Sequence, residues 1–188
     1  MNQFEFVETV FSNPVNCAIL DRLPELKADD AWLLSGAIFQ TVWNKITNRP
    51  AAYGIKDYDI FYFDPDTSWE AEDAVIRRAE TLFADLNVPI EVRNQARVHI
   101  WYEEKFGAPY PPLTRATDGI DRFLCDCAMV GMRYAREATY GAYAPKGLAD
   151  VASMTVRPNR VPNFHPERYR EKAERWREVW PEITILPE

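Results

Sequence analysis

The sequence predicts an α/β domain in which a short mixed β-sheet carries helices on one face. Three short runs rich in apolar and strand-forming residues, 31–34, 58–63 and 89–92, each precede a segment with helical character. The chain has 188 residues, near the length of one domain, and its 13% aromatic content can build a sizeable core. We expect one domain over residues 1–144 and a C-terminal extension over 145–188 that packs on it.

The N-terminal part of the chain is predicted to be mainly helical. Apolar residues recur at helical spacing up to about residue 26, and two prolines divide this stretch. The run 31–34 indicates a buried strand that ends just before Gly36. A helix is expected to follow directly, over 37–46.

Residues 58–63 are rich in aromatic side chains and are expected to form a strand that stops at Pro65. Thr67 and Glu70 have the spacing of a capping box, which predicts the start of a helix. This helix should run to about residue 86. Its expected apolar face consists of Trp69, Ala74, Ile76, Ala79, Leu82 and Phe83.

The second half of the chain alternates short predicted elements with proline-rich loops, of which 107–112 is the most rigid. The predicted elements are a strand at 89–92, helices at 96–106 and 119–123, strands at 127–134 and 139–143 around a polar turn at Arg136-Glu137, and a short helix near 148–151.

The last segment, 166–180, is predicted to be an amphipathic helix. Tyr169, Ala173, Trp176 and Trp180 fall on one side of it. Its lysine and arginine residues alternate with glutamates, so we expect them to form a solvated charged face. A helix that binds nucleic acid is the alternative interpretation.

The charge of the chain is concentrated in one place. The formal net charge is −7, which argues against a protein that binds duplex nucleic acid through its phosphates. Seven acids lie between Asp57 and Asp73, a stretch without lysine or arginine. The remaining 22 acids equal the 22 bases, so the acidic excess belongs to this segment.

Cysteine content and hydropathy suggest a soluble protein of the reducing cytoplasm. The three cysteines are too few for a disulfide scaffold. Cys125 and Cys127 lack the spacing of a zinc site and are expected at alternate positions of a strand. No apolar run approaches the ~18 residues of a membrane span, and the acidic N-terminus does not resemble a targeting peptide. Nothing in the sequence indicates an oligomeric state.

The predicted strand–glycine–helix unit at Gly36 is a candidate phosphate site. Free N–H groups and the positive end of the helix dipole suit an anion, and glycine allows close approach to the backbone. Many such turns, however, use glycine for steric reasons only.

Asp57 and Asp59 begin a predicted strand, where residues i and i+2 point to the same side. Two carboxylates so placed repel each other unless a cation lies between them, and Mg²⁺ takes such oxygen ligands. A solvent-facing pair at a frayed strand end is the alternative. Asp64 and Asp66 lie roughly 16 Å or more along the strand and are expected to be turn residues.

Glu91 stands between the apolar residues Ile90 and Val92 on the next predicted strand. A carboxylate in such a strand is costly unless it is paired or bound to a metal. If the two strands are neighbours, Glu91 completes a three-carboxylate site that can hold two metal ions. Arg93 and Arg97 follow and are candidates for phosphate contacts.

These segments resemble the nucleotidyltransferase signature of the DNA polymerase β superfamily. In particular, the chain is similar to stand-alone bacterial nucleotidyltransferase-like proteins, over roughly residues 32–180. The matching segments are Gly36–Trp43, Tyr53–Asp59, Ser68–Asp73, Val92–His99, Tyr110–Leu113 and Ile120–Phe123.

The resemblance implies a polymerase-β-type fold and transfer of a nucleotide from an NTP to an unidentified acceptor. It implies that Asp57, Asp59 and Glu91 are the catalytic residues and bind Mg²⁺ or Mn²⁺, and that the turn at Gly36 holds the triphosphate. The residues expected to contact the nucleotide are Gly36, Ala37, Gln40, Lys56, Arg93, Asn94 and Arg97.

Two positions depart from the usual pattern of the superfamily. Ala37 supplies an N–H but no hydroxyl at a position that is commonly glycine or a small polar residue. Glu91 is one methylene longer than the commoner aspartate.

The residues alone do not exclude two other functions. One is a metal-dependent nuclease, which Glu91-x-Arg93 faintly resembles. The other is a non-catalytic nucleotide-binding module, against which the presence of all three acids argues. His99 and His165 are expected to be structural, and Trp101 and Tyr102 to belong to the core with base stacking as the alternative.

Overall fold

The fold is taken from a computed structural model that describes residues 1–135 and 139–188. Within these residues a five-stranded mixed sheet has the order β3-β2-β1-β4-β5, with β2 and β3 parallel and the other neighbours antiparallel. This confirms the predicted α/β class. The strands are β1 (Trp32–Leu34), β2 (Tyr58–Tyr62), β3 (Ile90–Asn94), β4 (Gly131–Tyr134) and β5 (Tyr140–Tyr143).

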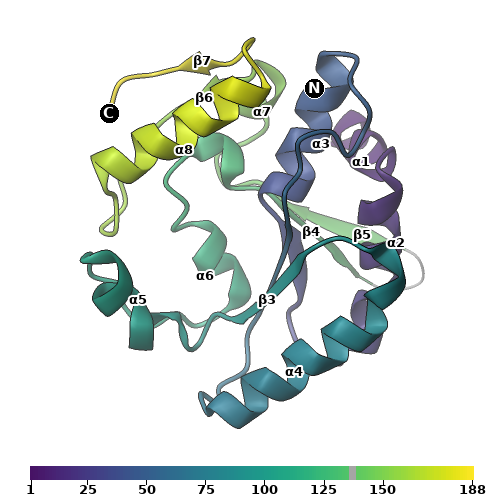
Figure 1. Cartoon of the computed structure of the whole chain (residues 1–188), viewed down its shortest axis with the longest axis vertical. Coiled ribbons are helices and arrows are strands. Elements are labelled where there is room, and N and C mark those ends of the chain that lie inside the picture. Colours follow the sequence, from purple (N-terminus) through teal and green to yellow (C-terminus); the bar gives the residue numbers. More distant parts are fainter. Residues whose placement is uncertain (136–138) are drawn as a thin grey trace.

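Helices surround this sheet, and a small parallel pair, β6 (Thr155–Val156) and β7 (Thr184–Ile185), lies near the C-terminus (Figure 1). Short 3₁₀ turns occupy 23–26, 84–86 and 126–128. The α-helices are α1 (Gln3–Phe11), α2 (Pro14–Arg22), α3 (Gly36–Ile46), α4 (Trp69–Leu82), α5 (Val98–Phe106), α6 (Ala116–Ile120), α7 (Ala149–Ala152) and α8 (Pro166–Val179).

Alternation along β2 separates the two faces of the sheet. Tyr58, Ile60 and Tyr62 are buried in the main core, which also receives side chains from α1 to α4, α7 and α8. Asp59 and Phe61 point to the other face, where Phe61 packs with a smaller cluster that includes α6. Asp59 therefore lies on the face of the sheet opposite the main core.

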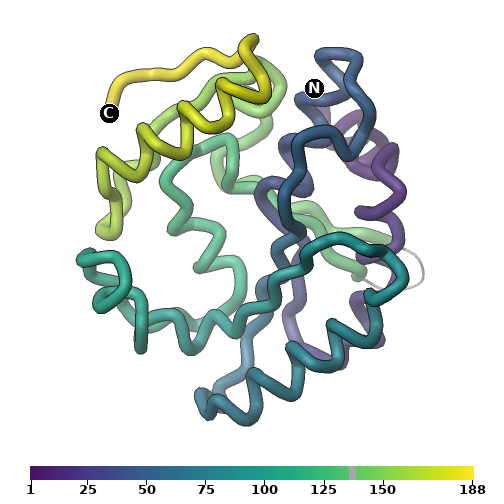
Figure 2. The backbone as a smooth tube through the Cα atoms, viewed as in Figure 1, coloured from purple at the N-terminus to yellow at the C-terminus, as the bar shows by residue number. Residues whose placement is uncertain are grey.

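The C-terminal helix packs directly on α3. Trp176 lies 4.9 Å from Phe39 between ring centroids, and Trp180 lies 5.6 Å from Trp43. The indole of Trp180 donates to the Asn44 side chain at 2.8 Å. Burial of each such ring stabilises the fold by about 1.5–3 kcal/mol, so residues 145–188 share the core of the preceding chain. Figure 2 shows α8 beside the upper end of α3.

One glycine brings the loop before β2 against this helix. Gly54 has φ +69°, and a Cβ there would lie 2.5 Å from Val179 of α8. Only glycine combines this backbone conformation with such a close approach. The loop that leads to Asp57 is thus held next to α8.

Several local predictions are corrected. Ser68, not Thr67, caps α4 by accepting from Ala71 N–H, and Trp69 is 55% exposed at the first position of that helix. Cys127 lies in a 3₁₀ turn instead of a strand. Cys125 is not in a strand either and makes only an isolated bridge to Pro158.

Other boundaries moved by a few residues. The two central helices are found at Val98–Phe106 and Ala116–Ile120, and β3 continues to Asn94. The predicted strand pair is present, but β4 begins at Gly131 instead of 127 because the chain turns at 126–128. Its predicted turn at 136–137 lies outside the described residues.

Candidate active site

Three carboxylates meet on the open face of the sheet. Asp59 of β2 is directly paired with Glu91 of β3 in the parallel ladder, and with Leu34 of β1 on its other side. Paired residues on neighbouring strands point to the same face, and Asp57 lies two residues before Asp59. The sheet register thus brings Asp59 and Glu91 together, and Asp57, just before β2, lies close enough for its charge to raise the pKa of Asp59.

The electrostatics of this trio are dominated by the central acid. Asp59 is half-buried, whereas Asp57 and Glu91 are exposed. Burial, with a smaller contribution from the negative charges of Asp57 and Glu91, raises the pKa of Asp59 to about 7 against the opposing effect of Lys172 and Arg93. Glu91 is held by Arg93 at 3.3 Å.

The donor set fits a hard divalent cation. The half-buried Asp59 carboxylate is repelled by the charges of Asp57 and Glu91, which help to raise its pKa. A divalent cation would relieve this repulsion. As positioned, no three His, Cys, Asp or Glu side chains among the described residues form a ready-made metal cage.

A strained turn leads from β1 into α3. Ser35 is buried, with φ 54° and ψ −120°, a conformation that costs a non-glycine residue about 1–3 kcal/mol. The N–H groups of Gly36 and Ala37 precede the first bond to the Ser35 carbonyl, so the helix leaves them without a partner. The Gln40 amide lies over Gly36, where a Cβ would be 3.3 Å from its nitrogen.

A cleft of about 320 Å³ opens beside the acids and is bounded by β2, β3, α5, α6 and α8. Asp59 and Glu91 contribute its negative charge. Its five positive side chains are Arg93, Lys105, Arg122, Arg168 and Lys172.

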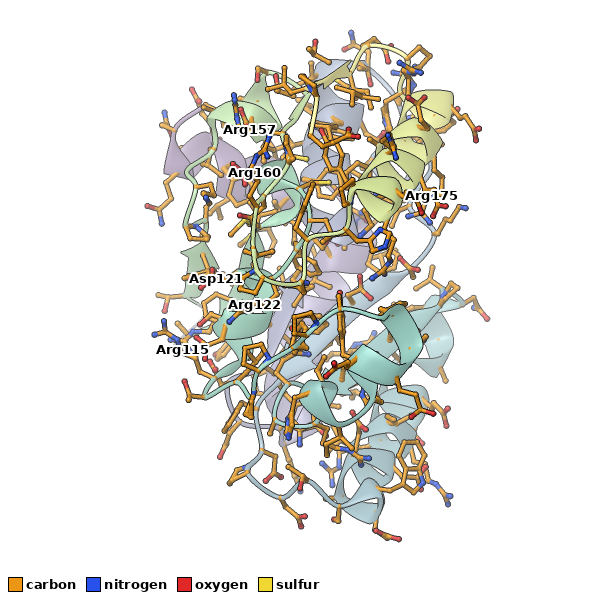
Figure 3. All side chains as sticks on the ribbon, turned by 90° about the vertical axis from the view of Figure 1, so that its left-hand side faces the viewer. Arg115, Asp121, Arg122, Arg157, Arg160 and Arg175 are labelled. Atoms are coloured by element: carbon orange, nitrogen blue, oxygen red, sulfur yellow. The ribbon has the colours of Figure 1, made fainter. Side chains whose placement is uncertain are left out.

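A smaller pocket of about 60 Å³ is lined by Asp57 together with Gln40, Lys56 and Arg175. Arg175 comes from α8 (Figure 3). The pocket therefore gathers Lys56 and Gln40, both expected at the nucleotide, beside Asp57.

The positive residues of α8 correct the expected solvated face. Arg168 and Lys172 line the cleft and Arg175 lines the smaller pocket, at spacings of four and three residues. One stripe of the helix therefore lines the two pockets that contain the acids, while Tyr169, Ala173 and Trp176 are buried in the core.

Comparison with known proteins agrees with this geometry. The profile of a family described as nucleotidyltransferase matches residues 21–185. The chain belongs to this nucleotidyltransferase family. A solved structure described as "The NMR structure of the protein reveals a CCA-adding enzyme head domain" superimposes with a TM-score of 0.80 and 25% identity, over 100% of this chain and 97% of that one. No curated protein matches the chain.

These findings confirm two predictions: that the chain resembles nucleotidyltransferases, and that it has the nucleotidyltransferase fold. None of its described helices is long and apolar enough to cross a membrane.

Two of the predicted nucleotide contacts lie elsewhere in this nucleotidyltransferase. The Asn94 side chain is buried and bonds to the backbone of Asp64, Asp66 and Ala96. Arg97 donates to the Ser68 carbonyl at 2.7 Å and pairs with the buried Glu72. Both side chains are used to hold the loop between β2 and α4, so neither reaches the cleft.

The sequence reading missed several cleft residues. Gln95 and Arg122 lie in segments that carry the family resemblance but were not expected at the site, and Asn163 carries no local motif; only the fold brings the three together. The α8 stripe had a detectable signal, because its bases recur at i, i+4 and i+7 on a side of the helix next to the aromatic residues.

Proposed function

We propose that the protein is a metal-dependent nucleotidyltransferase that moves a nucleoside monophosphate from an NTP to a hydroxyl or other acceptor. The observation that carries this proposal is the pairing of Asp59 with Glu91 beside a cleft rich in positive charge. Asp57, the third acid, lies two residues before Asp59. In the reaction an acceptor oxygen bonds to the α-phosphorus, the bond to the β-phosphate oxygen breaks, and pyrophosphate leaves.

Asp57, Asp59 and Glu91 would hold Mg²⁺ or Mn²⁺. Bound there, the metal would supply charge neutralisation for the phosphates and activation of the attacking oxygen. Without a cation, Asp59 has a pKa of about 7 and is partly protonated at neutral pH. A cation competes with that proton, so metal binding should strengthen as the pH rises.

The residues around Asp57 support a position for the triphosphate. The free N–H groups of Gly36 and Ala37 are suited to phosphate oxygens. Gln40 packs on that turn and also lines the small pocket with Lys56 and Arg175. The phosphates would lie between the turn and α8, where positive charge stabilises the negative charge that develops on pyrophosphate.

The direct test is incubation with each NTP and Mg²⁺, with release of pyrophosphate and mass analysis of the products. Asp59→Asn should abolish turnover. Asp73→Asn is the matched control, since Asp73 lies in the same acidic segment but pairs with Arg77 on the surface. Turnover that survives in Asp59→Asn would refute the proposal.

Two further outcomes separate the alternatives. Cleavage of RNA or DNA would indicate a nuclease, and nucleotide binding without turnover under any acceptor would indicate a non-catalytic module. Titration with Mn²⁺ tests the metal site itself. Unchanged affinity in Asp57→Asn and Asp59→Asn would exclude these acids as ligands.

A further inference from the structure

The cleft beside the acids carries positive charge at both of its ends. Burial raises the pKa of Asp59, and Lys172 and Arg93 lie close enough to oppose that rise, so these two cations belong to the end with the acids. At the other end, the Arg168 guanidinium lies 3.7 Å from the centre of the Phe106 ring of α5. The cleft therefore has a second positive region, away from the carboxylates.

The cations of this second region have no acidic partners. Lys105, Arg122 and Arg168 all line the cleft, and none of them makes an ion pair within the described residues. Arg122 and Arg168 are half-buried, and a charge that is partly removed from water is costly unless it is paired. In a chain with a net charge of −7, acids are plentiful. Three neighbouring cations without a carboxylate therefore favour an anionic ligand with more than one negative charge.

The backbone of Arg122 is fixed while its side chain is left unbonded. Its N–H donates to the Gly119 carbonyl at 3.2 Å, and its carbonyl accepts from Asn163 Nδ2 at 3.1 Å. Its guanidinium makes no hydrogen bond within the part of the chain that the structure describes. A guanidinium has five N–H donors in a fork that matches phosphate oxygens. Arg122 is therefore positioned, and free, to bind an anion.

Arg168 is aligned by the same asparagine. Its guanidinium donates to the Tyr102 hydroxyl at 3.3 Å, and this hydroxyl also accepts from Asn163 Nδ2 at 3.2 Å. Only one of its donors is used in this way. Asn163 thus links Arg122 and Arg168, which come from α8 and from the end of α6, into one arrangement on the cleft wall.

The register of the sheet places this cleft opposite the turn proposed for the triphosphate. Leu34, Asp59 and Glu91 form one row across β1, β2 and β3, and the turn at Gly36 follows Leu34. The cleft contains Glu91 but none of the residues that line the small pocket. In phosphoryl transfer the attacking and leaving oxygens lie roughly in line on opposite sides of the phosphorus. With pyrophosphate leaving on the side of the turn, the acceptor must enter from the side of Glu91, which is the cleft.

We infer that the acceptor is a small molecule that carries a phosphate group, which Arg122 and Arg168 bind while its hydroxyl faces the acids. This inference rests on the proposed function. The acceptor oxygen bonds to the α-phosphorus as the bond to pyrophosphate breaks, and the hydroxyl proton passes to water. A phosphate monoester has about two negative charges at neutral pH, in keeping with several cations. The cleft volume of about 320 Å³ is that of a site for a small ligand.

The test is whether a phosphate binds together with the nucleotide. The α,β-methylene analogues of the four NTPs, which cannot be turned over, are first titrated by calorimetry with Mg²⁺. The protein is then saturated with the tightest of them and titrated with inorganic phosphate and with glycerol 3-phosphate. We expect both to bind the saturated protein, and glycerol without its phosphate not to bind.

Two variants assign the phosphate to the cleft. Arg122→Gln and Arg168→Gln should each weaken phosphate binding by about tenfold or more, as expected for the loss of a charge-assisted hydrogen bond, and change the affinity for the NTP analogue by less than about twofold. Arg122→Gln should keep its melting temperature, because its guanidinium makes no hydrogen bond to lose. Arg175→Gln should show the reverse pattern of binding. Arg177→Gln, on the surface of α8, is the matched control and should change neither.

The possible outcomes separate this inference from the proposed function. If the NTP analogue binds but displaces phosphate, the cations of the cleft serve the nucleotide, and the inference is wrong while the proposed function stands. Unchanged phosphate affinity in both arginine variants would also overturn the inference. Binding of an RNA oligonucleotide, but not of glycerol 3-phosphate, would contradict a small acceptor. Failure of all four analogues to bind would refute both the inference and the proposed function.

Discussion

Asp59 and Glu91 are paired across the parallel strands β2 and β3, so that two carboxylates from residues 32 positions apart share one face of the sheet. The strand β2 is central enough to bury Asp59 partly, while Glu91 on the edge strand β3 stays exposed. In the absence of a cation, this pairing of two carboxylates lowers the free energy of unfolding when both are charged.

Asp59→Asn should stabilise the metal-free protein at pH 8 by about 1–3 kcal/mol, a value discounted for partial exposure. The pKa of Asp59 is about 7 in the folded protein and near 3.8 when unfolded, so the folded state holds the extra proton between these values. The stability of the wild type should therefore fall from about pH 4 to pH 7 and then level off. Urea unfolding across this range checks the expectation; a constant difference from the variant would contradict it.

Lys172→Gln should weaken NTP binding by about tenfold, because a charge that faces the acids and phosphates is lost. Lys172 also lowers the pKa of Asp59, so the pH dependence of Mn²⁺ binding should move to higher pH. Both are measured by titration calorimetry. Arg177→Gln, which removes a charge from the last turn of α8 outside both pockets, should change neither.

Arg97→Met should destabilise the fold by about 3–5 kcal/mol, since it leaves the buried Glu72 without its cation. The double variant Arg97→Met, Glu72→Gln should recover most of this loss, because glutamine removes the unpaired charge and keeps an acceptor for the buried Asn94 N–H. Chemical denaturation provides the free energies. If Arg97 contacted nucleotide instead, the double variant would regain stability but not NTP affinity, so NTP binding to the recovered protein decides between the two roles.

Gly119→Ala should cost about 1–3 kcal/mol, because the added methyl group displaces Gln95 and Phe61 at the wall of the cleft. Thermal unfolding measures the loss. Gly141→Ala is the matched control, since a Cβ there makes only ordinary contacts at 3.6 Å with Arg133. Equal effects of the two substitutions would show that the cleft wall is not tightly packed.

The sequence by itself determined the alternation of short strands with helices and the candidate acids. Local patterns carry this information: the apolar runs 31–34 and 58–63 form strands, and the i, i+2 spacing of Asp57 and Asp59 places them on one face. The turn residues Asp64 and Asp66 were also predictable, since each accepts from a backbone N–H two residues later.

Only the tertiary structure decided which other residues join the acids. Asn94 and Arg97 follow Glu91 closely in the sequence, yet buried hydrogen bonds and the ion pair with Glu72 hold them away from the cleft. Lys172 and Asn163 lie more than 70 residues beyond Glu91. Lys172 reaches the cleft because α8 packs on α3, and Asn163 because it bonds to Tyr102 and to the Arg122 carbonyl. Contacts between distant segments depend on core packing, which local sequence patterns do not encode.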